Sequence, residues 1–230
     1  MNKNYDVRGA LFADRYEAGH ALAEALRAYE REHPVVLGIP RGGIPVAAAV
    51  ADDLHADLDV IVARKLGAPE SAELAIGAVT ANGGQYLNDE IIRELGVSAA
   101  YLEREIAHQM EEADRREKLF RGTGQHIPLE GRTAIVVDDG LATGATMRAA
   151  ARSVRRRAPG RLVIAVPVGS VQACQDMRAE ADDVVCLHRP ESFWAVGFYY
   201  RHFEPVPDDE VARILASHRQ ARSTAGVPTP

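Results

Sequence analysis

Two adjacent carboxylates precede a loop of small residues in the segment from Ala134 to Thr146, which reads AIVVDDGLATGAT. The four apolar residues before Asp138 and Asp139 predict a buried strand, and the residues after the loop predict a helix. Helix N-termini offer free N–H groups and partial positive charge, which suit a phosphate. The carboxylates would repel a phosphate, but they can accept hydrogen bonds from neutral hydroxyls. The segment therefore predicts a phosphate site beside a diol site, as a ribose 5-phosphate requires.

Basic residues and glycines follow two other short apolar segments. Arg41-Gly42-Gly43 comes after Val35–Ile39, and Arg64-Lys65 comes after Leu58–Ala63. Glycines let backbone amides approach an anion closely, and basic side chains donate charge-assisted hydrogen bonds to it. Ligands of open parallel sheets bind beyond the carboxyl ends of the strands. We therefore expect these two segments to converge with Asp138–Thr146 on one site.

The elements that would position these residues alternate along the chain. Short apolar runs predict strands, and apolar residues at helical spacing predict the helices between them. This alternation is typical of an α/β fold with a twisted parallel sheet and helices on both faces. The glycine-rich segment Leu66–Gly84 predicts a loop with a weak hairpin around Ala75–Thr80, which is a candidate lid. The expected strands are 35–39, 58–63, 134–137, 162–168 and 184–187, and the expected helices are 14–32, capped by Asp14, 45–54, a long helix capped by Ser98, and 146–157.

The composition is that of a globular protein. Hydrophobic residues make up 47% of the 230 residues and charged residues 26%, which suits one domain with a full core. The formal net charge of -6 argues against a general nucleic-acid-binding surface. Cys174 and Cys186 form no disulfide framework. No apolar run approaches the roughly 18 residues of a membrane span, and Met1–Arg8 lacks the apolar core of a signal peptide. We expect a cytoplasmic protein that binds neither nucleic acid nor membrane.

The segment Ala134–Thr146 resembles the signature of type I phosphoribosyltransferases, which consists of apolar residues, two acids, three variable residues and Thr-Gly-x-Thr. Arg41-Gly42-Gly43 resembles the pyrophosphate loop of that family. Arg64 and Lys65 follow the next predicted strand, where the family tends to place a basic residue. The resemblance implies that the ribose diol is bound by Asp138 and Asp139, the 5′-phosphate by Ala142, Thr143, Gly144, Ala145 and Thr146, and the pyrophosphate by Arg41, Gly42, Gly43, Arg64 and Lys65, with Arg41 and Lys65 as catalytic residues.

The resemblance also implies the type I phosphoribosyltransferase fold, in which a small hood covers the core. We expect a single domain over residues 1–230, with the core at about 33–188, hood segments at about 86–121 and 189–206, and a frayed tail at 222–230. Pro190–Tyr200 is similar to the hood segment of hypoxanthine-guanine phosphoribosyltransferases, where an aromatic ring stacks on the purine. Either Phe193 or Trp194 would stack on the acceptor, unless the aromatic cluster only closes the core.

The activity that the resemblance implies is that of a glycosyltransferase of the pentosyltransferase class. Such an enzyme transfers ribose 5-phosphate from phosphoribosyl pyrophosphate to a nitrogen acceptor, with a Mg²⁺ ion that is held mainly by the donor. The acceptor is expected to be a nucleobase or a related heterocycle, and we expect a homodimer. A non-catalytic regulator that binds phosphoribosyl pyrophosphate or a nucleotide, and a hydrolase acting at the same site, are the alternatives.

Two positions depart from the purine enzymes. Ala142 stands where those enzymes carry an aspartate in the phosphate loop, and Arg201 stands near the place of their second acid. The arrangement is more similar to bacterial phosphoribosyltransferase-like proteins of unassigned acceptor, some of which are fused to hydrolase domains. The sequence therefore leaves the acceptor open.

Overall fold

Strands and helices alternate through residues 10–224, which the computed structural model describes. The strands are β1 Val35–Gly38, β2 Asp57–Val60, β3 Ala63–Ala68, β4 Ser71–Thr80, β5 Gln85–Leu87, β6 Thr133–Val137, β7 Arg161–Val168 and β8 Asp183–His188. The α-helices are α1 Arg15–Ala25, α2 Gly43–Asp53, α3 Asp89–Glu94, α4 Ala99–Arg121, α5 Ala145–Arg155, α6 Val171–Asp176 and α7 Asp208–Thr224, and the 3₁₀ helices are η2 Arg27–Glu32, η3 Met177–Ala179 and η4 Val196–Tyr199.

The central sheet is parallel, in the order β2-β1-β6-β7-β8. Its register pairs Val35 of β1 with Asp57 of β2 and with Ala134 of β6. β1 and β6 are buried along their whole length, as expected of strands that helices cover on both sides. The predicted parallel sheet is confirmed. β2 is the strand that differs most from its prediction, because it ends at Val60 rather than at Ala63.

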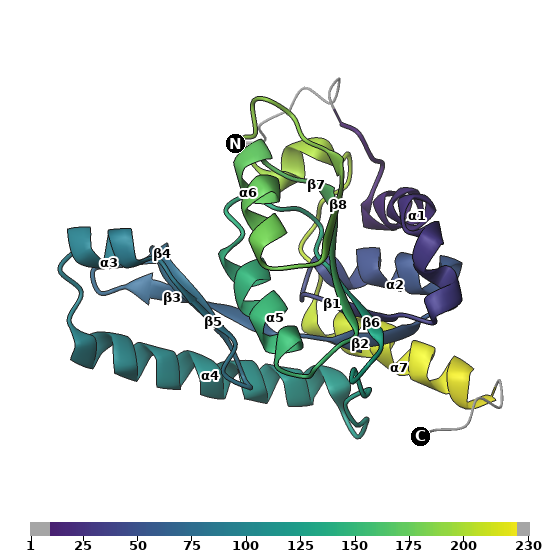
Figure 1. Cartoon of the computed structure of the whole chain (residues 1–230), viewed down its shortest axis with the longest axis horizontal. Coiled ribbons are helices and arrows are strands. Elements are labelled where there is room, and N and C mark those ends of the chain that lie inside the picture. The colour runs from purple at the N-terminus through teal and green to yellow at the C-terminus, as the bar shows by residue number, and fades with distance from the viewer. Residues whose placement is uncertain (1–9, 225–230) are drawn as a thin grey trace.

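Helices cover both faces of this sheet (Figure 1). α1, α2 and α7 pack on one face, in an apolar cluster that includes Leu26, Leu215 and Val36 of β1. α5 and α6 pack on the other face, in a cluster that includes Met147 and Val35 of β1. Neighbouring residues of one strand thus point to opposite layers, as the pleat of a strand requires. The predicted α/β class with helices on both faces is confirmed.

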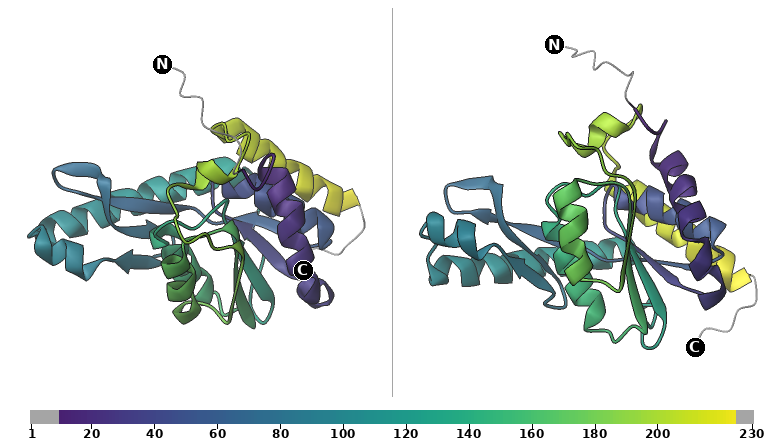
Figure 2. Two further views of the ribbon diagram at one scale, coloured as in Figure 1. Left: turned by 90° about the horizontal axis from the view of Figure 1, so that it is seen from above. Right: turned by 45° about the horizontal axis from the view of Figure 1, so that its top comes forward.

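An arm of residues 63–121 projects from this core and contains β3, β4, β5, α3 and α4 (Figures 1 and 2). Its three strands form an antiparallel sheet in the order β3-β4-β5. Leu66 and Val79 of this sheet pack against Leu102 and Met110 of α4. The long helix predicted after Ser98 is therefore confirmed, and its apolar residues face this sheet. The arm begins well before residue 86, where the first hood segment was expected.

β3 and β4 occupy most of Leu66–Gly84, so the loop predicted for that segment is wrong, whereas the antiparallel pairing expected around Ala75–Thr80 is present in β4. Glycine and alanine have low strand propensity, and packing outweighs that local preference. Ala78 packs against Ala145 and Ala149 of α5. A Cβ added at Gly77 would collide with the backbone oxygen of Tyr86 in β5. The small residues that predict a loop therefore let the arm pack closely.

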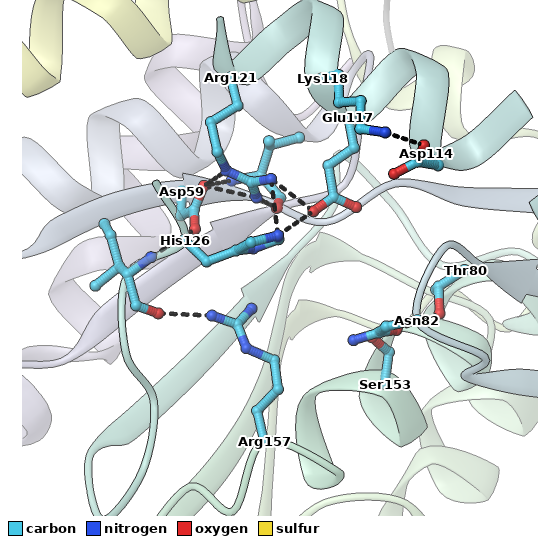
Figure 3. A network of polar contacts seen from close by, with 12 residues as sticks. Asp59, Thr80, Asn82, Asp114, Glu117, Lys118, Arg121, His126, Ser153 and Arg157 are labelled. Carbon is cyan, nitrogen blue, oxygen red and sulfur yellow. Dashed lines mark hydrogen bonds and ion pairs between the residues drawn. The ribbon is translucent and has the colours of Figure 1, made fainter. Parts of the chain in front are cut away.

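A buried ion-pair network joins the arm to the central sheet (Figure 3). Arg121, at the end of α4, donates hydrogen bonds to Asp59 Oδ1 of β2 from Nε at 3.2 Å and from Nη2 at 3.1 Å. Its Nη1 donates to Glu117 at 2.8 Å. Asp59 also accepts a hydrogen bond from the backbone of Ile127 at 3.2 Å. Arg121 and Ile127, at the two ends of the segment that follows α4, are therefore both bonded to Asp59 of β2.

The helix caps predicted from the sequence are present. Asp14 accepts hydrogen bonds from the first turn of α1, and Ser98 accepts one from the first turn of α4. α7 runs to Thr224, so the first three residues of the expected frayed tail 222–230 are helical. The rest of that tail and Met1–Arg8 lie outside the described residues. Within residues 10–224, no helix combines the length and the apolar character that crossing a membrane requires.

Candidate functional site

The aspartate pair and the Arg41-Gly42-Gly43 turn lie together at the carboxyl ends of two neighbouring strands. β1 and β6 pair in parallel, and their last hydrogen bond runs from Ile39 N to the oxygen of Val137 at 2.9 Å. A Cβ added at Gly42 would collide with the Asp139 carboxylate, and one added at Gly43 would lie 2.9 Å from the Cα of Asp138. Glycine permits this approach because it has no Cβ. The turn, whose Pro40–Arg41 peptide bond is cis, therefore packs directly on the carboxylates.

Arg15 and Tyr200 hold Asp139 in place. Arg15 Nε donates to Asp139 Oδ2 at 2.9 Å, and Arg15 Nη1 donates to the backbone oxygen of Glu204 at 3.0 Å. Its guanidinium lies over the ring of Phe203, 3.8 Å from the centroid. The Tyr200 hydroxyl donates to the backbone oxygen of Asp139 at 2.6 Å. Arg15 belongs to no motif of the sequence, and Tyr200 was expected only as part of the segment Pro190–Tyr200, since both residues lie far from Asp139 in the chain.

The carboxylates of Asp138 and Asp139 differ in the charges that surround them. Burial, together with the neighbouring charge of Asp139, raises the pKa of Asp138 well above its usual range. Burial also raises the pKa of Asp139, but the charge of Arg15 opposes that rise. Asp138 Oδ1 accepts a hydrogen bond from the Asp139 N–H at 2.9 Å. A ligand that donated hydrogen bonds to the pair would stabilise its ionised form.

The loop after the aspartates leads into α5 in a geometry that suits an anion. Leu141 is fixed to the neighbouring strand, since its N–H donates to the oxygen of Val168 at 2.9 Å. The Ser170 hydroxyl donates to the oxygen of Ala142 at 2.8 Å. Gly144 has φ of 80° and is the N-cap of α5, and no side chain among the described residues caps that helix. Ala142 and Thr143 are exposed. The first N–H groups of α5 are therefore available to a phosphate.

The basic residues predicted for the pyrophosphate are only partly brought together. Arg41 Nη1 lies 3.6 Å from Asp208 Oδ1 at the start of α7. Arg64 and Lys65 lie inside β3, so their predicted place at the exit of the preceding strand is wrong, because β2 ends earlier than expected. Successive strand residues point to opposite faces of a sheet. Arg64 Nε donates to Gln109 of α4 at 3.1 Å.

Lys65 lies on the other face of the arm's sheet. It pairs in register with Ala78 of β4, and Ala78 packs against Ala145 at the start of α5. Directly paired residues of neighbouring strands share a face. Lys65 therefore lies on the face toward the phosphate loop, whereas Arg64 lies toward α4.

The two candidate aromatic residues differ in exposure. The side chain of Trp194 is 83% exposed. Phe193 is half-buried and packs against Tyr199, with 5.4 Å between ring centroids. Val196, two residues beyond Trp194, fills the space where Gly140 would carry a Cβ. The segment therefore contacts the aspartate loop and presents Trp194 to solvent nearby.

The donor set of the site fits Mg²⁺, which prefers oxygen ligands and retains several from water or substrate phosphates. Asp138 and Asp139 supply carboxylate oxygens at the sheet edge. Among residues 10–224, no group of three or more His, Cys, Asp or Glu side chains could hold a metal ion. The remaining ligands of a Mg²⁺ ion at the aspartate pair would therefore come from a bound phosphate compound and water.

Comparison with known proteins relates the chain to one family. The family model of the phosphoribosyl transferase domain matches residues 13–201 of this chain. Two proteins of Mycobacterium tuberculosis, from strains CDC 1551 and H37Rv, have names that describe them as phosphoribosyl transferases. Each is 45% identical over 210 residues, which cover 91% of this chain and 47% of the relative. The chain thus spans about half the length of these relatives. TT1426 from Thermus thermophilus, a solved crystal structure, is 44% identical, with 90% of this chain and 98% of that chain covered and a TM-score of 0.76.

Proposed function

The chain belongs to the phosphoribosyl transferase domain family, and we propose that it transfers ribose 5-phosphate from phosphoribosyl pyrophosphate to a nitrogen acceptor, a nucleobase or a related heterocycle. One observation carries the proposal: the aspartate pair, the Gly42-Gly43 turn and the start of α5 meet at one edge of the sheet. Their chemistry matches the diol, the pyrophosphate and the 5′-phosphate of that donor.

The donor is held at its ribose and at its phosphate. Asp138 and Asp139 accept hydrogen bonds from the two ribose hydroxyls, and Arg15 keeps Asp139 in position. The N–H groups of the first turn of α5 donate to the 5′-phosphate, as do the hydroxyls of Thr143 and Thr146. Binding at two points fixes the direction of the bond between C1 and the pyrophosphate. This positioning removes part of the entropic barrier to the reaction.

The chemical step exchanges one bond at C1 for another. The C1–oxygen bond breaks and the pyrophosphate leaves with its electron pair, while the acceptor nitrogen gives its lone pair to C1 and then loses a proton to solvent. Arg41 and Lys65 stabilise the charge of the leaving pyrophosphate. When bound, Mg²⁺ neutralises part of that charge. Trp194 stacks on the aromatic acceptor, and the exposure of its ring supports this role.

Release of pyrophosphate tests the proposal. The protein is incubated with phosphoribosyl pyrophosphate and Mg²⁺, with each member of a panel of nucleobases and with none. We expect release only when an acceptor is present, and loss of that release in the variant with both Asp138→Asn and Asp139→Asn. Asp114→Asn, on the exposed side of α4, is the control that retains activity.

The other outcomes identify the alternatives. Release without any acceptor, with formation of ribose 5-phosphate, would show a hydrolase. Binding of the donor by calorimetry without any release would favour a regulator. Failure to bind the donor at all would overturn the assignment of the site.

A further inference from the structure

Two guanidinium groups share the carboxylate of Asp208, the first residue of α7. Arg41 Nη1 lies 3.6 Å from Asp208 Oδ1, and Arg116 Nη1 lies 4.0 Å from the same oxygen. Arg41 belongs to the turn after β1, whereas Arg116 belongs to α4 of the arm. The core, the arm and the C-terminal helix therefore meet at one negatively charged oxygen.

The polar atoms of this group are incompletely bonded. Asp208 Oδ1 and Arg116 Nε are buried, and neither makes a hydrogen bond with any described residue. Buried polar atoms of native proteins are almost always hydrogen-bonded, so an unbonded one is open to a partner from outside the chain, either water or a ligand. For Arg116 Nε, whose N–H can only donate, that partner is an acceptor such as an oxyanion.

The surrounding charge also favours an anion. Arg64 adds a third guanidinium, and burial together with the charge of Arg116 lowers the pKa of Arg64. Glu112 also lies near Arg64, but its carboxylate accepts two hydrogen bonds from the guanidinium of Arg115, which balances its charge. Within residues 10–224, Asp208 is then the one carboxylate that forms ion pairs with both Arg41 and Arg116. The positive charge of the group exceeds its negative charge.

We propose that Arg116 is a second pyrophosphate-binding residue beside Arg41, and that Asp208 occupies the position of the anion until the donor binds. This inference rests on the proposed function, which places Arg41 on the pyrophosphate. Any anionic group that replaces the Asp208 carboxylate beside Arg41 also comes within reach of Arg116. A pyrophosphate offers several oxygens, so it can accept hydrogen bonds from both guanidinium groups at once.

Moving the Asp208 carboxylate away from Arg41 requires little free energy. The side chains of Arg41 and Asp208 are 46% and 40% exposed, and their contact of 3.6 Å is longer than a hydrogen bond. Ion pairs of such exposure contribute little to stability, because water and salt screen them. Binding of the donor through Arg116 would also fix the arm against the core at the moment when the pyrophosphate is bound.

Calorimetric titrations with three ligands test the inference, each in the presence of Mg²⁺. Phosphoribosyl pyrophosphate and inorganic pyrophosphate contain the group that Arg116 is proposed to bind, whereas ribose 5-phosphate lacks it. We expect Arg116→Gln to weaken the first two by about tenfold or more, because a hydrogen-bonded charge is lost, and to leave ribose 5-phosphate within about twofold. Asp208→Asn should strengthen the first two, because it removes the internal competitor.

Lys118→Gln is the matched control. Lys118 lies two residues after Arg116 on α4, with a side chain that is 75% exposed and paired with Asp114, so the change should leave all three affinities as they are. If Arg116→Gln does not fold, Arg116→Lys replaces it in the same comparison, since it keeps the charge and loses the planar fork.

The outcomes separate this inference from the proposed function. If Arg41→Gln weakens pyrophosphate binding and the Arg116 variants do not, the inference is wrong and the proposed function stands. Equal losses for all three ligands would show that Arg116 only supports the fold, which also overturns the inference. If neither Arg41→Gln nor Arg116→Gln affects either pyrophosphate compound, the pyrophosphate site of the proposed function is itself misplaced.

Discussion

Neighbouring aspartates of the site have different environments although they share one loop. Asp139 has a guanidinium at 2.9 Å, and Asp138 has the charge of Asp139 beside it in a half-buried position. The folded state therefore holds the proton of Asp138 more tightly than the unfolded chain does. A carboxyl with a raised pKa contributes its full stability below the ordinary pKa of 3.8. That contribution is lost as the pH rises through the raised pKa.

Asp138→Asn removes this electrostatic cost and a ligand contact together. The amide oxygen can still accept the hydrogen bond from the Asp139 N–H. We expect a higher thermal midpoint than the wild type at neutral pH, a difference that disappears in acid, and donor binding weaker by about tenfold or more. Thermal unfolding and calorimetry between about pH 4 and pH 8 measure both effects. A stabilised variant with unchanged donor affinity would show that Asp138 does not bind the ribose.

At the scale of the element, buried charged residues hold the arm to the central sheet. Arg121 is 5% exposed and lies between Asp59, 4% exposed, and Glu117, 8% exposed. All three make hydrogen bonds within this network. Removal of the shared cation leaves two buried carboxylates without the guanidinium that both of them contact, which is more costly than the loss of an exposed pair. Lys118 and Asp114, one helical turn apart on the exposed side of α4, provide that comparison (Figure 3).

Arg121→Leu should destabilise the protein by about 3–5 kcal/mol, as expected when one partner of a buried ion pair is removed. Lys118→Ala should cost less than about 1 kcal/mol, since its pair with Asp114 is exposed. Urea unfolding at neutral pH measures both free energies. Similar costs for the two variants would mean that the network around Arg121 is not what holds the arm.

The sequence predicted the core better than the arm, for a physical reason. Strands such as β1 and β6 consist almost entirely of apolar residues because both of their faces are buried, so their pattern is visible without any partner. β3 and β4 consist largely of glycine, alanine and polar residues, and their strand structure depends on contacts with α4 and α5. Arg64 and Lys65 were consequently expected at the exit of the strand 58–63, although they lie within β3.

The same distinction applies to the candidate site. Asp138, Asp139 and the loop that follows them are contiguous, so their arrangement could be predicted from one segment. Arg15, Tyr200 and Asp208 reach the site from the two ends of the chain. Their side chains are ordinary for a helix or a loop, and only the fold shows that they converge.

Across the whole molecule, the C-terminal part of the chain closes one side of the site. Val196 fills the space beside Gly140, Tyr200 bonds to Asp139, and Asp208 pairs with Arg41. Trp194 lies two residues before Val196 in the chain, and it is 83% exposed. An exposed indole within two residues of a site contact is well placed to stack on an aromatic acceptor, and such stacking contributes roughly 1–3 kcal/mol per base.

Trp194 is the single tryptophan of the chain, so its fluorescence reports on this position alone. We expect the signal to change when an aromatic acceptor or a nucleotide product binds, and to change less with ribose 5-phosphate, which has no ring to stack. Trp194→Ala should weaken acceptor binding roughly tenfold and leave donor affinity nearly unchanged, because the contacts proposed for the donor are made by other residues. Phe198→Ala, which removes an aromatic ring that is 51% exposed in the same segment, is the control and should alter neither affinity. If Trp194 fluorescence is indifferent to every aromatic ligand while the donor still binds, the acceptor lies elsewhere on the site.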